Sequence, residues 1–188
     1  MSLDQLKKSL SEAPIVKKGN YNYVIHPITD GIPYIPPELL KEVSHEIKKH
    51  IKKLGQVDRI VTIEAMGIPL ATVLSMDMGI PFTIIRKRAY GLPGEVSVEQ
   101  LTGYSKSKLY INGVQKADTI VIVDDVLSTG GTLHAVLSVF KKMNVVVKGV
   151  FIAINKGSHV TEISKEFNVP ITSIIAIDVL NGEVVIRT

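Results

Sequence analysis

The stretch IVIVDDVLSTGGTL, residues 120–133, decides how the rest of the sequence is interpreted. Four β-branched apolar residues are typical of a buried strand, and they end at Asp124 and Asp125. Two adjacent carboxylates repel each other, and glycine weakens the element that contains it. Because neither feature is expected where stability alone matters, the stretch has the character of a binding site.

Strands alternate with helices on both sides of this stretch. The helical segments 67–79, 132–144 and 158–169 lie between strands that are almost entirely apolar. Strands buried on both faces carry such runs, so the order predicts a parallel sheet covered by helices on both sides. The expected fold class is therefore α/β, with an open and mostly parallel sheet. The predicted strands are residues 58–64, 81–87, 119–125, 145–155 and 171–179.

The region before the first of these strands is more irregular. Residues 1–14 carry leucines at helical spacing, residues 21–25 alternate as a short strand would, and residues 25–37 form a turn-rich connector. Pro37 suits the first position of a helix, and Gly55 is the expected end of that helix.

The composition is that of one ordinary globular domain. The chain has 188 residues, of which 45% are hydrophobic and 21% charged, so we expect a single domain over residues 1–188. The lack of cysteine excludes disulfides, thiolate metal sites and a cysteine nucleophile. The five histidines show no metal-ligand spacing. No apolar run has membrane-spanning length and residues 1–14 are no signal peptide, so a cytoplasmic protein is expected.

The net charge of +4 suits either a nucleic acid or a small anionic substrate. The densest basic run, residues 41–55, keeps its apolar side chains on one helical stripe and its lysines largely off that stripe. No aromatic residues interleave with these lysines, as a single-strand binding surface would need. The run is therefore a solvated helix face, and we expect neither a nucleic-acid nor a membrane partner.

The residues after the acidic pair favour a phosphate ligand. Ser128, Thr129 and Thr132 bring hydroxyls, and Gly130 and Gly131 allow the backbone to approach closely, just where a helix begins. Backbone N–H groups and the helix dipole bind anions at such a point. No GxxxxGK[ST] and no GxGxxG pattern occurs. Carboxylates beside a phosphate suit sugar hydroxyls, so a ribose 5-phosphate fits both halves.

This stretch resembles the signature of the type I phosphoribosyltransferases, which bind phosphoribosyl pyrophosphate (PRPP). The resemblance covers about residues 21–178 and is closest to the archaeal hypoxanthine/guanine phosphoribosyltransferase subfamily. It implies that Asp124 and Asp125 are catalytic and hold the ribose hydroxyls, and that residues 1–36 contribute to a hood. The implied PRPP-binding residues are Asp124, Asp125, Val126, Leu127, Ser128, Thr129, Gly130, Gly131 and Thr132.

Two further segments resemble parts of the same family. The run VTIEAMGIPLA is similar to its pyrophosphate loop, which often contains a non-proline cis peptide, and a cationic strand end follows. The polar tract of residues 89–113 falls where the family has its flexible hood loop, and residues 106–111 are expected to pair as a short strand. The implied pyrophosphate-binding residues are Glu64, Ala65, Met66, Gly67, Arg86, Lys87 and Arg88, and the implied loop contacts are Tyr104, Ser105 and Lys106.

Lys156 ends the strand after the PRPP helix and indicates the base. In the 6-oxopurine members a lysine at a comparable strand end donates to the exocyclic oxygen, and an ammonium cannot accept from the amino group of adenine. Met66 agrees, since the adenine enzymes tend to have arginine there, whereas Asn155 departs from the glutamate of many xanthine-type relatives. Plainer interpretations remain: Lys156 as a surface lysine, and Glu64 as a cap of the following helix.

The resemblance implies a purine salvage enzyme that makes IMP or GMP and pyrophosphate from PRPP and hypoxanthine or guanine. It implies a homodimer and Mg²⁺ held through pyrophosphate and the ribose hydroxyls, with no metal bound directly by the protein. The alternatives are adenine or xanthine transfer, or a PRPP-binding regulator without catalysis. A regulator generally needs a DNA-binding module, and no recognition helix is evident in the sequence.

Overall fold

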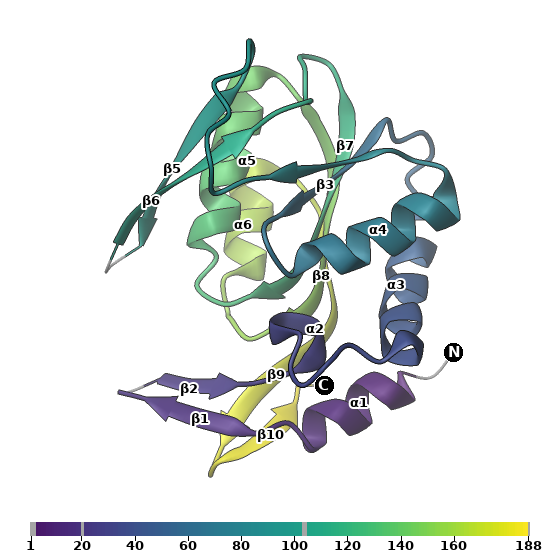
Figure 1. Cartoon of the computed structure of the whole chain (residues 1–188), viewed down its shortest axis with the longest axis vertical. Helices are drawn as coiled ribbons and strands as arrows, with labels where there is room; N and C mark the ends of the chain where they lie inside the picture. The colour runs from purple at the N-terminus through teal and green to yellow at the C-terminus, as the bar shows by residue number, and fades with distance from the viewer. Residues whose placement is uncertain (1–2, 20, 103–104, 188) are drawn as a thin grey trace.

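The structure is a computed structural model and describes residues 3–19, 21–102 and 105–187 (Figure 1). A six-stranded sheet runs through its centre in the order β10-β9-β8-β7-β3-β4. The inner strands pair in parallel, and only β10 is antiparallel to its neighbour β9. The bounds are β3 Arg59–Ile63, β4 Phe82–Ile85, β7 Thr119–Leu127, β8 Val146–Asn155, β9 Ile171–Leu180 and β10 Glu183–Ile186. The α/β fold with a mostly parallel sheet is confirmed.

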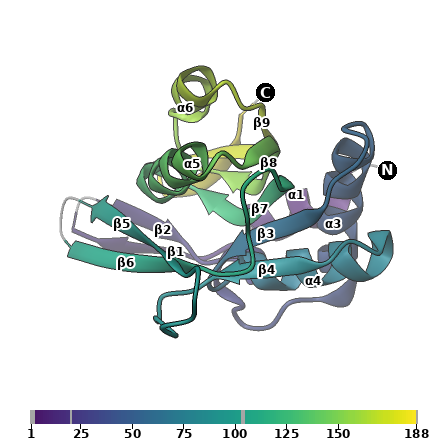
Figure 2. The same ribbon diagram turned by 90° about the horizontal axis from the view of Figure 1, so that it is seen from above.

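Helices cover both faces of this sheet, as Figure 2 shows from above. On one face lie α3 (Pro37–Lys52) and α4 (Gly67–Met78), whose apolar side chains pack on Ile60, Val121 and Phe151. On the other face lie α5 (Gly131–Met143) and α6 (Val160–Phe167). The two apolar layers fix the sheet between them because β3, β4, β7, β8 and β9 each contribute apolar side chains to both.

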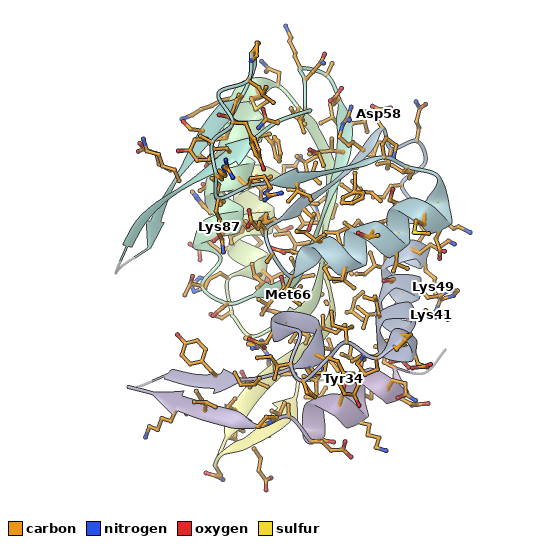
Figure 3. All side chains as sticks on the ribbon, viewed as in Figure 1. Tyr34, Lys41, Lys49, Asp58, Met66 and Lys87 are labelled. Atoms are coloured by element: carbon orange, nitrogen blue, oxygen red, sulfur yellow. The ribbon has the colours of Figure 1, made fainter. Side chains whose placement is uncertain are left out.

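Pro37 begins α3, as predicted, but the helix ends at Lys52, before Gly55. Its lysines lie off the buried stripe: Lys41 and Lys49 project from the outer side of the helix (Figure 3), and Lys49 pairs with Glu46 at 2.6 Å. This is the solvated helix face that the sequence predicts.

The N-terminal segment differs from its prediction in two ways. The expected helix and strand are α1 (Asp4–Ser11) and β2 (Tyr21–Val24), but β2 pairs with β1 (Ile15–Lys18), which the sequence analysis missed. The turn-rich connector contains a short helix, α2 (Pro27–Asp30).

His26 joins these N-terminal pieces and is fully buried. Its Nδ1 accepts from the N–H of Ile28, so Nε2 carries the proton and donates to Ser9 Oγ at 2.9 Å. Burial lowers the pKa of His26 to about 4, so the ring is neutral at pH 7. This neutral histidine ties α1 to the chain that enters α2.

The polar tract of residues 89–113 contains a hairpin of β5 (Val96–Thr102) and β6 (Ser105–Ile111). The strand expected at residues 106–111 is confirmed, although it is one residue longer. Val98 and Leu109 are buried in the core layer that α5 and α6 share. The tract is therefore anchored to the domain over its paired part.

Candidate active site

The acidic pair lies at the end of β7, which continues through it to Leu127. Burial raises the pKa of Asp125 to about 6, and this residue is 7% exposed. Burial and the neighbouring charge of Asp125 raise the pKa of Asp124, whose Oδ1 also accepts from the N–H of Asp125 at 3.1 Å. Burial at this strand end disfavours the charged form of both carboxylates. A ligand that brings hydroxyl donors or a cation would stabilise their charged forms.

The hydroxyl-bearing loop runs directly from this strand into α5. Gly130 is the N-cap of the helix, with φ +77°, and Gly131 is its first residue. A Cβ on Gly130 would lie 2.5 Å from Ile163 Cδ1, so α6 packs closely against the turn. The predicted loop is thus at a helix N-terminus, as an anion site needs. Within it the side chain of Leu127 belongs to the core.

The predicted pyrophosphate loop follows β3 and has a cis peptide bond between Glu64 and Ala65. Glu64 Oε2 accepts from Arg86 Nε at 2.9 Å and from the N–H of Lys87 at 3.0 Å. These bonds, led by that of Lys87, lower the pKa of Glu64. The interpretation of Glu64 as a helix cap is wrong, because α4 has Met66 at its N-cap and no side-chain cap bond.

Gly67 brings this loop against the acidic pair. A Cβ there would collide with Thr62 Oγ1 and would lie 2.7 Å from Asp124 Oδ1 and 3.1 Å from the carbonyl of Val123. The loop also meets α2, since a Cβ on Gly31 would lie 3.4 Å from Met66 Cε. Only a residue without a side chain lets the loop lie this close to Asp124.

The cationic strand end is only partly held in place. Arg86 is oriented by Glu64 and lies 6.0 Å from the centre of the Tyr90 ring, while Arg88 lies 5.8 Å from the same ring. Lys87 and Arg88 are exposed.

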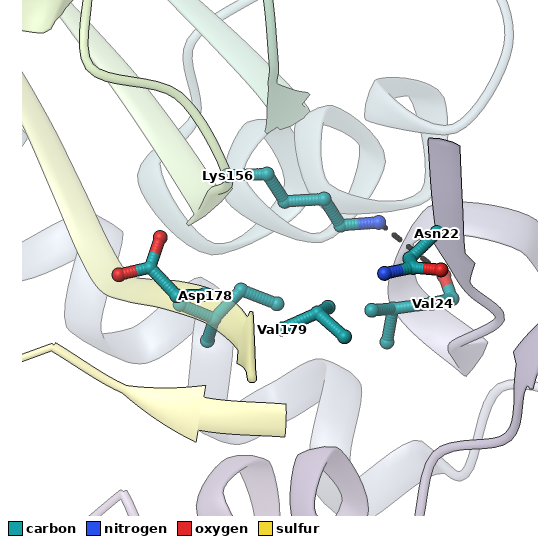
Figure 4. A pocket seen from close by; sticks show the side chains of 6 residues that line it. Asn22, Val24, Lys156, Asp178 and Val179 are labelled. Carbon is teal, nitrogen blue, oxygen red and sulfur yellow. Dashed lines mark hydrogen bonds between the residues drawn. The ribbon is translucent and has the colours of Figure 1, made fainter. Parts of the chain in front are cut away.

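Lys156 lines a pocket of about 170 Å³ between the N-terminal hairpin and β9. Its Nζ donates to the carbonyl of Val24 at 3.3 Å, as Figure 4 shows, and burial lowers its pKa. The interpretation of Lys156 as a plain surface lysine does not fit this burial. The other lining residues are Asn22, Val24, Ile177, Asp178 and Val179.

Asn155 does not face this pocket with its side chain. Its Oδ1 accepts from the N–H of Gly157 at 2.9 Å, and the residue is 7% exposed. The asparagine that stands where many xanthine-type relatives have glutamate therefore closes the turn after β8.

The sequence analysis missed the walls of the pocket. Asp178 lies near the carboxyl end of β9, so the rule that ligands bind at strand ends could have found it. Asn22 and Val24 carry no such signal, because β2 belongs to a separate hairpin. Tyr104, a predicted loop contact, lies outside the described residues, and Ser105 and Lys106 lie in β6, opposite Thr102 and Leu101.

Replacing Glu64 with glutamine is expected to raise the inhibition constant of pyrophosphate about fivefold, because Arg86 loses its charged partner and with it a fixed orientation. Product-inhibition kinetics measure this. Glu46→Gln is the matched control, since Glu46 pairs with Lys49 on the outer side of α3. Equal inhibition constants for the wild type and Glu64→Gln would contradict the predicted role of Arg86 in binding pyrophosphate.

Comparison with known proteins identifies the family and the fold. Residues 34–180 match the family model of the phosphoribosyl transferase domain. The chain is 50% identical over 182 residues to the hypoxanthine/guanine phosphoribosyltransferase of Methanothermobacter thermautotrophicus, covering 97% of this chain and 93% of that protein. It is 49% identical to the enzyme of the same name from Methanocaldococcus infernus, covering 97% of this chain and all of that one (100%).

Solved structures of low sequence identity share the fold. The adenine phosphoribosyltransferase of Saccharomyces cerevisiae superposes with a TM-score of 0.74 at 21% identity, over 91% of this chain and 97% of that one. The Leishmania donovani enzyme of the same name gives 0.73 at 20% identity, over 94% and 80%. At such identities the likeness extends to the fold alone.

Proposed function

The chain belongs to the phosphoribosyl transferase family, and we propose that it is a purine salvage enzyme that transfers the phosphoribosyl group of PRPP to hypoxanthine or guanine. The products are IMP or GMP and pyrophosphate. The observation that carries the choice of base is the half-buried ammonium of Lys156, which lines a pocket beside the PRPP signature. Relatives about half identical over nearly their whole length bear the name of this activity.

The reaction is a displacement at the anomeric carbon of the ribose. A ring nitrogen of the base forms the new bond as the bond to pyrophosphate breaks, so positive charge develops on the ribose. Asp124 and Asp125 accept hydrogen bonds from the ribose hydroxyls and favour that charge, while residues 128–132 hold the 5-phosphate at the start of α5. The protein supplies position and charge, and no protein nucleophile is needed.

The leaving pyrophosphate is received by the loop of residues 64–67 and by the cationic end of β4. Arg86 is turned toward this loop by its bond to Glu64, and Lys87 and Arg88 add positive charge. We infer that the flexible loop with Tyr104, Ser105 and Lys106 excludes water from the site.

The oxygen donors at the end of β7 fit a Mg²⁺ ion that PRPP carries. Mg²⁺ prefers oxygen ligands, keeps several waters and is commonly bound through one or two carboxylates together with substrate phosphates. Asp124 and Asp125 would hold such an ion indirectly, through the ribose hydroxyls, with no direct bond from the protein. When bound, it neutralises charge on the leaving group.

Lys156 selects an oxo group at position 6 of the purine. Its ammonium has three donors and no acceptor, so it can bond the oxygen of hypoxanthine or guanine but not the amino group of adenine. The hydrogen bond that it now makes to the carbonyl of Val24, at 3.3 Å, is long enough to be exchanged for one to the base.

The test incubates the purified chain with PRPP, Mg²⁺ and each of hypoxanthine, guanine, xanthine and adenine, and identifies the nucleotide formed. We expect IMP and GMP to form fastest. Faster turnover of adenine would contradict the role of Lys156, and no product with any base would favour the regulator.

Lys156→Met is expected to raise KM for hypoxanthine and guanine about 30-fold, because a charged hydrogen bond is lost while the apolar stem is kept. Steady-state kinetics with each base measure this, and KM for PRPP should change little. Lys148→Met is the control, since Lys148 lies in β8, the strand that Lys156 follows, and donates to the carbonyls of Leu54 and Gln56 far from the pocket. An unchanged KM for both bases in Lys156→Met would remove the lysine from base recognition.

We infer one domain over residues 1–188 with residues 1–36 in the hood, supported by the His26 to Ser9 contact and by the place of β2 in the pocket wall. We infer a cytoplasmic homodimer that binds neither nucleic acid nor membrane, and sedimentation measures its mass. Over the described residues, every helix is too short or too polar to cross a bilayer.

A further inference from the structure

The backbone around Lys156 is held by a hydrogen bond and by close packing. The N–H of Lys156 donates to the carbonyl of Leu127 at 2.8 Å, which ties it to the strand of the acidic pair. Next to it, Gly157 lies so close to the PRPP loop that a Cβ would collide with the carbonyl oxygen of Ser128. The position of the lysine is therefore coupled to the PRPP loop through the main chain.

Arg187, near the C-terminal end of the sequence, also holds the backbone around Lys156. Its Nη2 donates to the carbonyl of Asn155 at 3.1 Å and to that of Gly157 at 3.0 Å. These two carbonyls flank Lys156. One guanidinium nitrogen thus spans the residue that the proposed function assigns to the base.

The same arginine also reaches the opposite wall of the pocket. Its Nε lies 3.7 Å from Asp178 Oδ2, and its backbone N–H donates to the carbonyl of Ala176 at 2.8 Å. Asp178 lines the pocket together with Lys156. Arg187 is therefore in contact with both sides of the pocket, although it does not line the pocket itself.

We propose that Arg187 is a positioning residue for purine recognition: it clamps the turn that carries Lys156 and sets the separation between Lys156 and the β9 wall. This inference rests on the proposed function, because it takes the pocket to be the base site. A planar guanidinium offers several donors in a fixed geometry, so it can hold two carbonyls and a carboxylate together. A lysine keeps the charge but lacks this fork.

The test measures kcat and both KM values with hypoxanthine and PRPP for the wild type, Arg187→Ala and Arg187→Lys. We expect Arg187→Ala to raise KM for hypoxanthine about tenfold and KM for PRPP less than about twofold, because two carbonyl bonds beside Lys156 are lost. The KM of Arg187→Lys for hypoxanthine should lie between those of the wild type and Arg187→Ala. Merely structural damage would change both KM values or the amount of folded protein.

Arg59→Ala is a matched control. Arg59 Nη2 lies 3.8 Å from Asp118 Oδ2, its side chain is 29% exposed against 31% for Arg187, and it lies at the other end of the sheet. Within the part of the chain that the structure describes, the buried Nε–H of both arginines has no hydrogen-bond partner. This variant should lose comparable thermal stability and keep both KM values.

A double mutant shows whether Arg187 acts through Lys156. In the Lys156→Met background, adding Arg187→Ala should change KM for hypoxanthine less than about twofold, because the group that Arg187 positions is already gone. A full tenfold further rise would overturn the inference.

The outcomes separate this inference from the proposed function. A wild type that converts no purine refutes the proposed function, whereas an active wild type with an unchanged KM for hypoxanthine in Arg187→Ala refutes only the clamp. If Arg187→Ala does not fold, Arg187→Lys decides. A selective rise in KM for hypoxanthine in that variant supports the clamp, and wild-type constants overturn it.

Discussion

Asp125→Asn is expected to lower kcat on the order of 10²- to 10³-fold, since an asparagine amide cannot supply the negative charge that faces the ribose as its positive charge develops. The side chain keeps its size, and the backbone bond from its N–H to Asp124 Oδ1 remains available. Steady-state kinetics with PRPP and hypoxanthine measure the loss.

The same substitution is expected to leave the fold intact or to stabilise it at pH 7. The folded protein raises the pKa of Asp125 to about 6, so the free energy of unfolding falls as pH rises from about 4 to about 6 and stays low above that. A neutral asparagine removes this loss, which amounts to as much as about 3 kcal/mol. Denaturant unfolding of both proteins at pH 4 and pH 7 tests the sign.

Asp118→Asn is the control for both measurements. Asp118 precedes β7 at its opposite end, where its Oδ2 accepts from the N–H of Gln115 at 2.8 Å, so kcat should not change. Normal turnover in Asp125→Asn would remove the ribose from the acidic pair. A lower stability of this variant at pH 7 than the wild type would contradict the cost of the buried charge.

Gly157→Ala is the second substitution from which we expect a large loss of activity. The new Cβ would meet the carbonyl oxygen of Ser128, a backbone atom that cannot rotate away, so the turn with Lys156 and the PRPP loop must separate. We expect kcat/KM to fall about 100-fold and the free energy of unfolding to fall by about 1–3 kcal/mol. Unlike the loss of the Arg187 clamp, this change should raise the KM values of PRPP and base together.

Gly149→Ala provides the comparison for this prediction. Gly149 lies earlier in β8, and the nearest atom to its Cβ would be Cζ of the Phe151 ring, at 3.2 Å. Its kcat/KM should stay within about twofold, since only the local packing must adjust. Thermal unfolding and kinetics of both alanine variants measure the difference. Wild-type KM values in Gly157→Ala would show that the turn and the loop move independently.

Much of the PRPP loop and the central sheet could be predicted because their signals are local. A run of β-branched residues, two carboxylates, a hydroxylic glycine turn and a helix follow each other within residues 120–133. The strand β1 (IVKK) and the short helix α2 (PITD) were missed, since β1 lacks an alternating pattern and the proline and aspartate of α2 are typical of a turn. The role of Glu64 was open because its partners, Arg86 and Lys87, are 22 and 23 positions away.

The sequence by itself determined the α/β order, the glycine turn that begins α5 and the place of the acidic pair at the end of its strand, because each depends on the pattern of neighbouring residues. Only the tertiary structure decided what surrounds Lys156. Lys156 meets Val24 across 132 positions, and Arg187 reaches Asn155 and Gly157 across 32 and 30 positions. Such contacts arise when the sheet brings distant strand ends together, and no local pattern of side chains specifies them.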